Sequence, residues 1–290
     1  TATLTVTAVN DAPVVAGAGG TLAYSEGAGP QVIDATLSLA DVDSPTITSA
    51  TVTIGGGFVS TEDVLAFTNT GTITGLYNPG TGVLTLTGSD TLAAYEAALE
   101  SVTYENTNTN NPNTGARTVT WMVNDGSASS AGVVSTITVT AVNDPPVNTV
   151  PGAQTVNEDT SLLLPGISVT DVENNLNTVQ LSVLNGTVTV TVSGTAMITA
   201  GANGSNTLTL SGSQADMVAT LASLAYQGTS NYNGPDTLTI TSTDMGSATD
   251  VDTVTITVGT GNTAPVANAG PNQILPVGTT VILDGTASRD

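Results

Sequence analysis

The chain has 290 residues and carries 24 aspartates and glutamates against 2 lysines and arginines, which gives a net charge of −22. So few basic residues exclude a cationic surface for nucleic acids or anionic lipids. Histidine and cysteine are absent, which excludes catalytic triads, zinc centres, thiol chemistry and disulfides.

The first predicted element is a strand over residues 1–9, in which threonine alternates with apolar residues before Asn10-Asp11 and a proline. The series returns as a strand over residues 136–140 followed by Asn143-Asp144 and a proline, and a third copy of the strand covers residues 253–257. Proline cannot continue a β-ladder, so each copy predicts the end of one domain and the start of the next.

These repeats predict four parts. They are the last strand of a preceding repeat at residues 1–11, complete repeats at 12–144 and 145–263, and the start of a further domain at 264–290. A repeat of this length can bury its own core. We therefore interpret the chain as an excerpt from a longer array of domains.

Within each repeat, threonine, valine, isoleucine and leucine alternate over short runs, and glycine, asparagine, aspartate and proline separate the runs. This pattern predicts the strands of a β-sandwich. Two segments, 91–102 and 213–224, follow helical spacing instead. Their apolar positions are Tyr95, Leu99 and Val102 in the first and Met217, Leu221 and Leu224 in the second. We predict one short helix per repeat, followed by strands that open at Tyr104 and Tyr226.

The next strand aligns between the repeats, from Arg117 in the first and from Asp236 in the second. Trp121 then stands at the position of Ile240, on one face with aliphatic residues. An aromatic ring in such an alternation is usually buried, so we predict that Trp121 is a core residue and not a platform for sugars.

Acidic residues recur in the same order in both repeats. A glutamate (Glu26 or Glu158) follows each Asn-Asp joint, then an acid-x-acid pair (Asp41 with Asp43, or Asp171 with Glu173), then an aspartate beside a glycine turn (Asp125 or Asp244). Such hard oxygen ligands suit Ca²⁺, which takes six to eight of them. The alternative is that turn aspartates bond only their own backbone.

This series resembles the cadherin-like repeats of large bacterial surface adhesins over residues 1–263. The resemblance implies Greek-key sandwiches of the cadherin or immunoglobulin type and calcium at the joints. It implies that Glu26, Asn143, Asp144, Asp171, Glu173 and Asp244 serve the joint between the repeats. It also implies that Asn10, Asp11, Asp41, Asp43 and Asp125 serve the joint before the first. The Asp-Arg-Glu motif that the family carries in mid-domain has no counterpart in this sequence.

Residues 264–290 resemble the start of a polycystic-kidney-disease-type (PKD) repeat, another extracellular sandwich. Together, the resemblances imply a protein on the bacterial cell surface whose partners are neighbouring repeats, with head-to-tail or lateral self-association in a filament as a further possibility.

Three functions remain open. The first is a calcium-stiffened spacer or filament segment, and the second is a carbohydrate-binding module of an exported protein. The third is an ice- or surface-binding face made of threonine arrays such as residues 187–191, although the β-propensity of threonine explains these arrays without a ligand. Paired carboxylates could hydrolyse glycosides, but aromatic residues make up only 3% of the chain and are too few for a sugar cleft. We therefore predict that the protein is not an enzyme.

Overall fold

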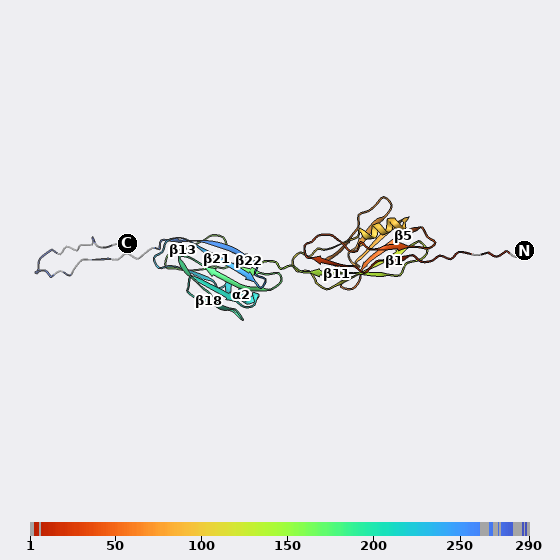
Figure 1. The fold of residues 1–290 in the computed structure, drawn as a ribbon. Helices are drawn as coiled ribbons and strands as arrows, with labels where there is room; N and C mark the ends of the chain where they lie inside the picture. The colour runs from red at the N-terminus through yellow and green to blue at the C-terminus, as the bar shows by residue number, and fades with distance from the viewer. Residues whose placement is uncertain are drawn as a thin grey trace. The chain divides into compact units, whose positions relative to one another are not determined.

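The structure is a computed structural model that describes residues 3–5, 7–261, 267–268, 272, 274–280, 286 and 288. The chain divides into two compact units, Thr1–Asp144 (unit 1) and Pro145–Asp290 (unit 2). In Figure 1 unit 1 runs from red to yellow-green and unit 2 from green to blue. Each unit is described by itself.

Unit 1 contains one large sheet of six strands in the order β2-β11-β10-β5-β8-β7. The strands are β2 (Thr21–Ser25), β5 (Thr46–Ile54), β7 (Thr74–Asn78), β8 (Val83–Thr91), β10 (Arg117–Asn124) and β11 (Val133–Thr140). β2 runs parallel to β11, and the other pairings are antiparallel.

Two small sheets complete unit 1, a pair β1-β4 and a three-stranded sheet β3-β9-β6. Their strands are β1 (Val14–Ala16), β3 (Gln31–Val32), β4 (Ser38–Ala40), β6 (Asp63–Ala66) and β9 (Thr103–Asn106). Val15, Leu65 and Tyr104 from these sheets share one buried cluster with Trp121 from the large sheet. The sheets are therefore the two layers of a sandwich around a single core.

Alternation along β10 shows why these residues form a strand with one buried face. Val119 and Trp121 are 0% exposed and Val123 is 1% exposed, whereas the residues between them are partly exposed. Successive strand side chains point to opposite faces, so the apolar residues all meet the core. The prediction that Trp121 is a core residue is confirmed.

The predicted helices are confirmed as α1 (Leu92–Glu100) and α2 (Gln214–Leu221). Each begins after a hydroxyl N-cap: Thr91 Oγ1 accepts from Ala94 N at 3.2 Å, and Ser213 Oγ accepts from Asp216 N at 3.2 Å. The six apolar residues named for the two segments are all 0% exposed. α1 links β8 to β9, and thereby carries the chain from the large sheet to the three-stranded sheet.

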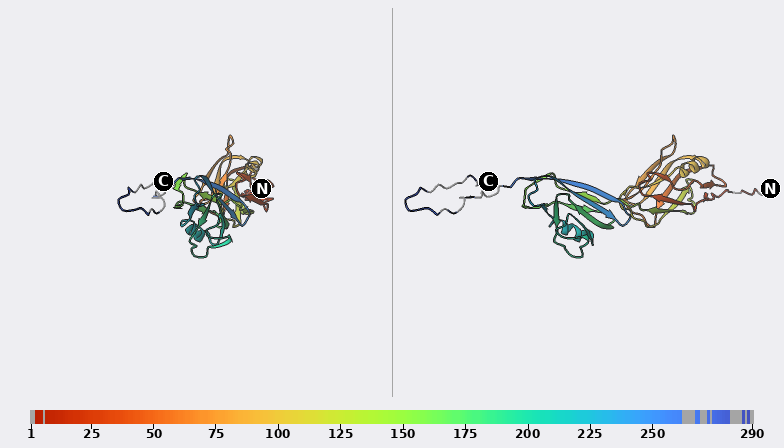
Figure 2. Two further views of the ribbon diagram at one scale, coloured as in Figure 1. Left: turned by 90° about the vertical axis from the view of Figure 1, so that its left-hand side faces the viewer. Right: turned by 60° about the vertical axis from the view of Figure 1, so that its left-hand side comes forward.

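Unit 2 repeats this architecture strand for strand, with β12 to β22 in the places of β1 to β11. Figure 2 shows it in green to blue. Its large sheet has the order β13-β22-β21-β16-β19-β18, beside the sheet β14-β20-β17 and the pair β12-β15. The bounds are β12 (Val147–Thr149), β13 (Gln154–Asn157), β14 (Ser161–Leu163), β15 (Ser168–Thr170), β16 (Leu176–Ser182), β17 (Gly186–Thr189), β18 (Met197–Gly201), β19 (Thr207–Ser211), β20 (Ala225–Gly228), β21 (Gly234–Asp244) and β22 (Thr249–Gly259). The predicted fold class, tandem β-sandwiches with one short helix each, is confirmed.

The strand predicted over residues 1–9 is wrong for the residues of that stretch that the structure describes, which lie outside any strand. Alternation shows which face a strand would bury, but a strand forms only where a second strand accepts and donates its hydrogen bonds. The opening strands predicted within residues 264–290 fall mostly outside the described residues.

No helix in the described part of the chain is long and apolar enough to cross a membrane.

Candidate metal-binding sites

One end of unit 1, its head, gathers the first set of predicted ligands. Asp41 follows the last residue of β4, and Asp125 follows the last residue of β10. Asn10 reaches the same place, because its Nδ2 donates to Asp125 Oδ2 at 2.9 Å. Asp11 N donates to Asp43 Oδ2 at 3.1 Å. All five residues that the sequence named for this joint are therefore neighbours.

Part of this set does what turn aspartates ordinarily do. Asp41 Oδ1 accepts from Asp43 N at 3.1 Å and from Ser44 N at 2.8 Å. Asp125 Oδ1 accepts from Ser127 N at 2.6 Å and from Ala128 N at 2.8 Å. One oxygen of Asp41 and one of Asp125 thus bond the backbone of their own turn, as the alternative to a metal site predicts.

The second oxygen of Asp41 is different. Asp41 Oδ2 is buried and accepts no hydrogen bond within the described structure. Asp41 is one of the residues that line a hollow of about 550 Å³, together with Asp11, Ala12, Val14, Ala40 and Val42. A buried carboxylate oxygen without a donor is costly, and a cation would satisfy it.

Hydrogen bonds at the head lower the pKa of two of its carboxyls, Asp41 and Asp125. The N–H of Ser44 lowers the pKa of Asp41 most, while burial and the charge of Asp125 act in the opposite direction. Hydrogen bonds from Ala128 N–H and from the side chain of Asn10 lower the pKa of Asp125. Ionised carboxylates near one another, with no basic side chain bonded to them, favour a bound cation.

The opposite end of unit 1, its base, places Glu26 beside the exit of the last strand. Glu26 N donates to Thr140 O at 2.9 Å, and Glu26 Oε2 accepts from Val142 N at 2.7 Å. Glu26 Oε1 and Asp144 Oδ2 are buried and accept no hydrogen bond within the described structure. Asn143 lies between them in the chain and donates to Asp144 O at 3.3 Å.

Unit 2 reproduces part of each arrangement. At its head, Asp171 Oδ1 accepts from Asn175 N at 3.2 Å, and Asp244 Oδ1 accepts from Ala248 N at 2.8 Å, the counterpart of the bond from Ala128 to Asp125. Asp171 and Asp244 are 5% and 1% exposed, and Glu173 is partly buried. At its base, Glu158 Oε1 accepts from Gly261 N at 3.1 Å, as Glu26 accepts from Val142.

No three acidic side chains within the described residues converge on a common point in the way that a bound metal ion requires. The acids at each end instead stand beside amide and backbone oxygens, without three carboxylates meeting at one point. Asp41, Glu26 and Asp144 each have one buried carboxylate oxygen that accepts no hydrogen bond. Each of these oxygens is a suitable ligand for calcium.

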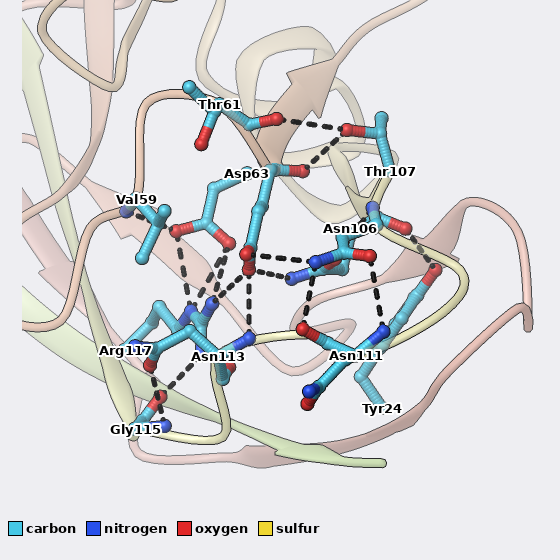
Figure 3. A network of polar contacts seen from close by, with 12 residues as sticks. Tyr24, Val59, Thr61, Asp63, Asn106, Thr107, Asn111, Asn113, Gly115 and Arg117 are labelled. Carbon is cyan, nitrogen blue, oxygen red and sulfur yellow. Dashed lines mark hydrogen bonds and ion pairs between the residues drawn. The ribbon is translucent and has the colours of Figure 1, made fainter. Parts of the chain in front are cut away.

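The structure contains a buried ionic network that the sequence analysis missed (Figure 3). Arg117 is 0% exposed, and its Nε donates to Asp63 Oδ1 at 3.1 Å and to Oδ2 at 3.3 Å. Its Nη2 lies 3.6 Å from Glu62 Oε2, and Tyr104 donates its hydroxyl proton to Asp63 Oδ1 at 2.6 Å. A signal was available: Arg117 shares its strand face with Val119 and Trp121, and an inward arginine requires an acidic partner.

A second buried network surrounds Trp121. Its Nε1 donates to Ser135 Oγ at 3.0 Å, and Ser135 Oγ donates to Asp34 Oδ2 at 2.7 Å. Gly20 N and Thr36 N donate to the same carboxylate, each at 3.1 Å. Burial would raise the pKa of Asp34, but these hydrogen bonds outweigh it and leave the pKa below its usual value. The indole is thus buried in the core, and its N–H group is hydrogen-bonded there.

The large aromatic side chains bear on the carbohydrate-binding alternative. Trp121, Tyr95, Tyr104 and Tyr226 are 0% exposed, and Tyr24 is 1% exposed. A sugar-stacking platform needs an exposed ring. These five rings therefore offer a saccharide no surface.

Comparison with known proteins gives one match among curated sequences and many weak structural similarities. No protein-family model matches the chain. The chain is 40% identical over 86 residues to halomucin from Haloquadratum walsbyi, which covers 28% of this chain and 1% of halomucin. The chain therefore spans only a small part of that relative.

Among solved structures, the chain is similar to human CDH23 EC21-23 at 15% identity and a TM-score of 0.37, over 97% of this chain and 81% of that one. Protocadherin Gamma B2 extracellular cadherin domains 1-5 give 14% identity and a TM-score of 0.35, over 88% and 42%. The fibronectin(III)-like modules of Clostridium thermocellum CbhA give 14% and 0.24, over 87% and 94%. At these scores we transfer no residue role from them.

Proposed function

We propose that the chain is a non-enzymatic structural segment of an extracellular protein, in which calcium bound at the ends of tandem β-sandwiches stiffens the chain. The observation that carries this proposal is the buried, unbonded Oδ2 of Asp41, at the end of unit 1 where Asn10, Asp11, Asp43 and Asp125 meet.

Charge is the first physical reason. The full sequence has 24 acids, and Arg117 is the one basic side chain among the described residues. Arg117 is already bonded to Asp63 and Glu62 in the core. The acids at the ends of the units therefore need a cation from solution to offset their mutual repulsion.

Chemistry is the second reason. The oxygens at the head of unit 1 come from carboxylates, a side-chain amide and the backbone, which are the ligands of Ca²⁺. The head of unit 2 repeats them with Asp171, Glu173 and Asp244, and the bases carry Glu26 and Glu158. The same order of acids in both units of the chain supports a structural metal, because surface acids that only aid solubility need no fixed order.

The architecture supports a spacer or filament segment. Two units of one topology follow each other in the chain, the sequence has no histidine or cysteine, and none of the described aromatic rings is exposed. The partners we propose are neighbouring repeats, and the proposed location is the outside of the cell, with a bacterial surface adhesin as the specific form. The similarity of one stretch to halomucin is in keeping with this proposal.

The test is to measure calcium binding and chain stiffness on residues 1–290. Equilibrium dialysis counts the bound ions, and small-angle scattering compares the maximum dimension in calcium with that in chelator. We expect calcium to lengthen and stiffen the chain, and Asp41→Asn and Asp144→Ala each to reduce the number of bound ions.

The matched controls are Glu100→Gln in unit 1 and Asp159→Asn in unit 2. Each removes one negative charge from a residue that is not itself a proposed ligand, and asparagine at 159 keeps the Oδ1 that accepts from Asn231 N at 3.2 Å. Equal scattering in calcium and chelator, or equal loss of ions in the controls and in Asp41→Asn, would refute the proposal.

A further inference from the structure

Unit 2 has polar residues at three core positions where unit 1 has valine. Because the strands and registers of the units correspond, Asn148 in β12 stands at the position of Val15, and Ser242 in β21 at that of Val123. Asp252 in β22 pairs with Ile240 as Val133 pairs with Trp121. In unit 1 the three valines belong to the hydrophobic core or pack against it.

The polar residues lie together in unit 2. Asn148 N donates to the carboxylate of Asp250 at 2.7 Å, which joins β12 to β22. Ser242 is directly opposite Asp250 in the β21–β22 ladder. Cross-strand partners share a face, so Ser242 and Asp250 point the same way, toward the interior.

Asp252 points to that interior as well. Strand residues two apart share a face, so Asp250 and Asp252 lie on the face of Val254, which is 1% exposed. Asp250 and Asp252 are themselves only partly exposed. One end of the sandwich interior therefore holds two carboxylates, an amide and a hydroxyl.

The neutral members of this group need a partner. Asn148 is 8% exposed and Ser242 is 0% exposed. Oδ1 and Nδ2 of Asn148 and Oγ of Ser242 are all buried without a hydrogen-bond partner within the described structure. Buried polar atoms of proteins are nearly always bonded to protein, water or an ion. Three such atoms beside two carboxylates indicate a ligand.

We propose that Asp250, Asp252, Asn148 and Ser242 bind a hard divalent cation of the calcium type in unit 2. This site uses none of the acids in the repeated series, and unit 1 has no counterpart of it. A water molecule alone would satisfy the amide and the hydroxyl but would leave two inward carboxylates without an opposite charge, since unit 2 has no described lysine or arginine. A cation can bind an oxygen of each of the four residues, whereas Nδ2 of Asn148 is a donor and needs an acceptor such as a carboxylate oxygen or a water on the ion.

The test counts calcium ions bound by the chain of residues 1–290, using equilibrium dialysis and native mass spectrometry. The decisive variant carries the valines of unit 1, Asn148→Val, Ser242→Val and Asp252→Val. We expect it to bind one ion fewer than the wild type. Asp41→Asn in unit 1 should remove a different ion, so combining the two sets should give additive losses.

Asp159→Asn is the control, and it should bind as many ions as the wild type. If the valine variant does not fold, as judged by circular dichroism, Asp252→Asn replaces it, because this residue is partly exposed and asparagine keeps its size. An unchanged ion count in the variant used would overturn the proposal and would assign the buried atoms to water only. Loss of an ion in Asp41→Asn alone would overturn this site and leave the proposed function standing.

Discussion

Asp63 and Asp236 accept hydrogen bonds from equivalent tyrosines, although they lie on strands that do not correspond. Tyr104 donates to Asp63 on β6 at 2.6 Å, and Tyr226 donates to Asp236 on β21 at 2.9 Å. The counterpart of Asp236 in unit 1 is Arg117, which neutralises Asp63. Both units therefore place a carboxylate at the tyrosine hydroxyl, but the carboxylate comes from β6 in unit 1 and from β21 in unit 2.

The first prediction concerns Arg117. Arg117→Met leaves the buried carboxylate of Asp63 without its cation, and loss of one partner of a buried ion pair costs about 3–5 kcal/mol. We expect urea unfolding to show this loss in unit 1. The double variant Arg117→Met with Asp63→Asn should recover part of it, since the fully buried charge of Asp63 is then gone as well. A single variant as stable as the wild type would contradict this account.

The second prediction concerns the place of Asp63 in unit 2, which is occupied by Gly186. A Cβ at Gly186 would lie 2.5 Å from Cε2 of Tyr226 and 2.6 Å from the backbone oxygen of Gln227. Gly186→Ala therefore forces the tyrosine or the strand to move, at a cost of about 1–3 kcal/mol for overpacking.

Gly152→Ala is the matched control, because a Cβ there meets nothing within 4 Å. Chemical unfolding should show Gly186→Ala to be clearly less stable than Gly152→Ala. Equal stability of the two variants would mean that the Tyr226 ring does not fix this site.

The third prediction concerns Trp121. Trp121→Ala removes a fully buried side chain and should cost about 3–5 kcal/mol of unfolding free energy. The indole of the wild type should emit at short wavelength and resist quenching by acrylamide. Ser135→Ala should shift this emission without exposing the ring, because it removes the hydroxyl that accepts from Nε1 at 3.0 Å. Ready quenching in the wild type would contradict the buried position.

The sequence predicted what depends on local periodicity. The helical spacing of Tyr95, Leu99 and Val102 and the strand face of Trp121 identified core residues without any knowledge of the partner elements. Asn10 and Asp125 could be grouped from the sequence only because the acids recur in a fixed order. In the structure, Asn10 Nδ2 lies 2.9 Å from Asp125 Oδ2.

What the sequence did not predict depends on contacts between distant segments. Asp63 and Arg117 are 54 residues apart in the sequence but bonded in the structure. Nothing in the sequence around either residue indicates the other as its partner. The polar core of unit 2 became visible only when the pairing of β21 with β22 aligned Asp252 with Val133. The strand expected at residues 1–9 failed for the same reason, because alternation does not specify the strand with which a segment pairs.

The last prediction concerns acid. Burial raises the pKa of both Asp34 and Glu62, but donated hydrogen bonds outweigh it, from Ser135 and Thr36 for Asp34 and from Asn113, Asn108 and Asn106 for Glu62. Both folded pKa values therefore lie below the ordinary 3.8 and 4.5. A carboxyl with a depressed folded pKa stabilises the fold above its unfolded pKa, and this contribution is lost as pH falls through the folded value.

We expect the unfolding free energy of unit 1 to be level at neutral pH and to decline once the pH passes below these ordinary values. Asp34→Asn should be less stable than the wild type at neutral pH, because it weakens the bonds from Ser135 and Thr36. It should also lose less stability on acidification, since one of the carboxyls with a lowered folded pKa is gone. Urea titrations of the variant, the wild type and Glu100→Gln across this range measure both effects. An Asp34→Asn variant that loses as much stability in acid as Glu100→Gln would show that Asp34 does not carry the acid sensitivity.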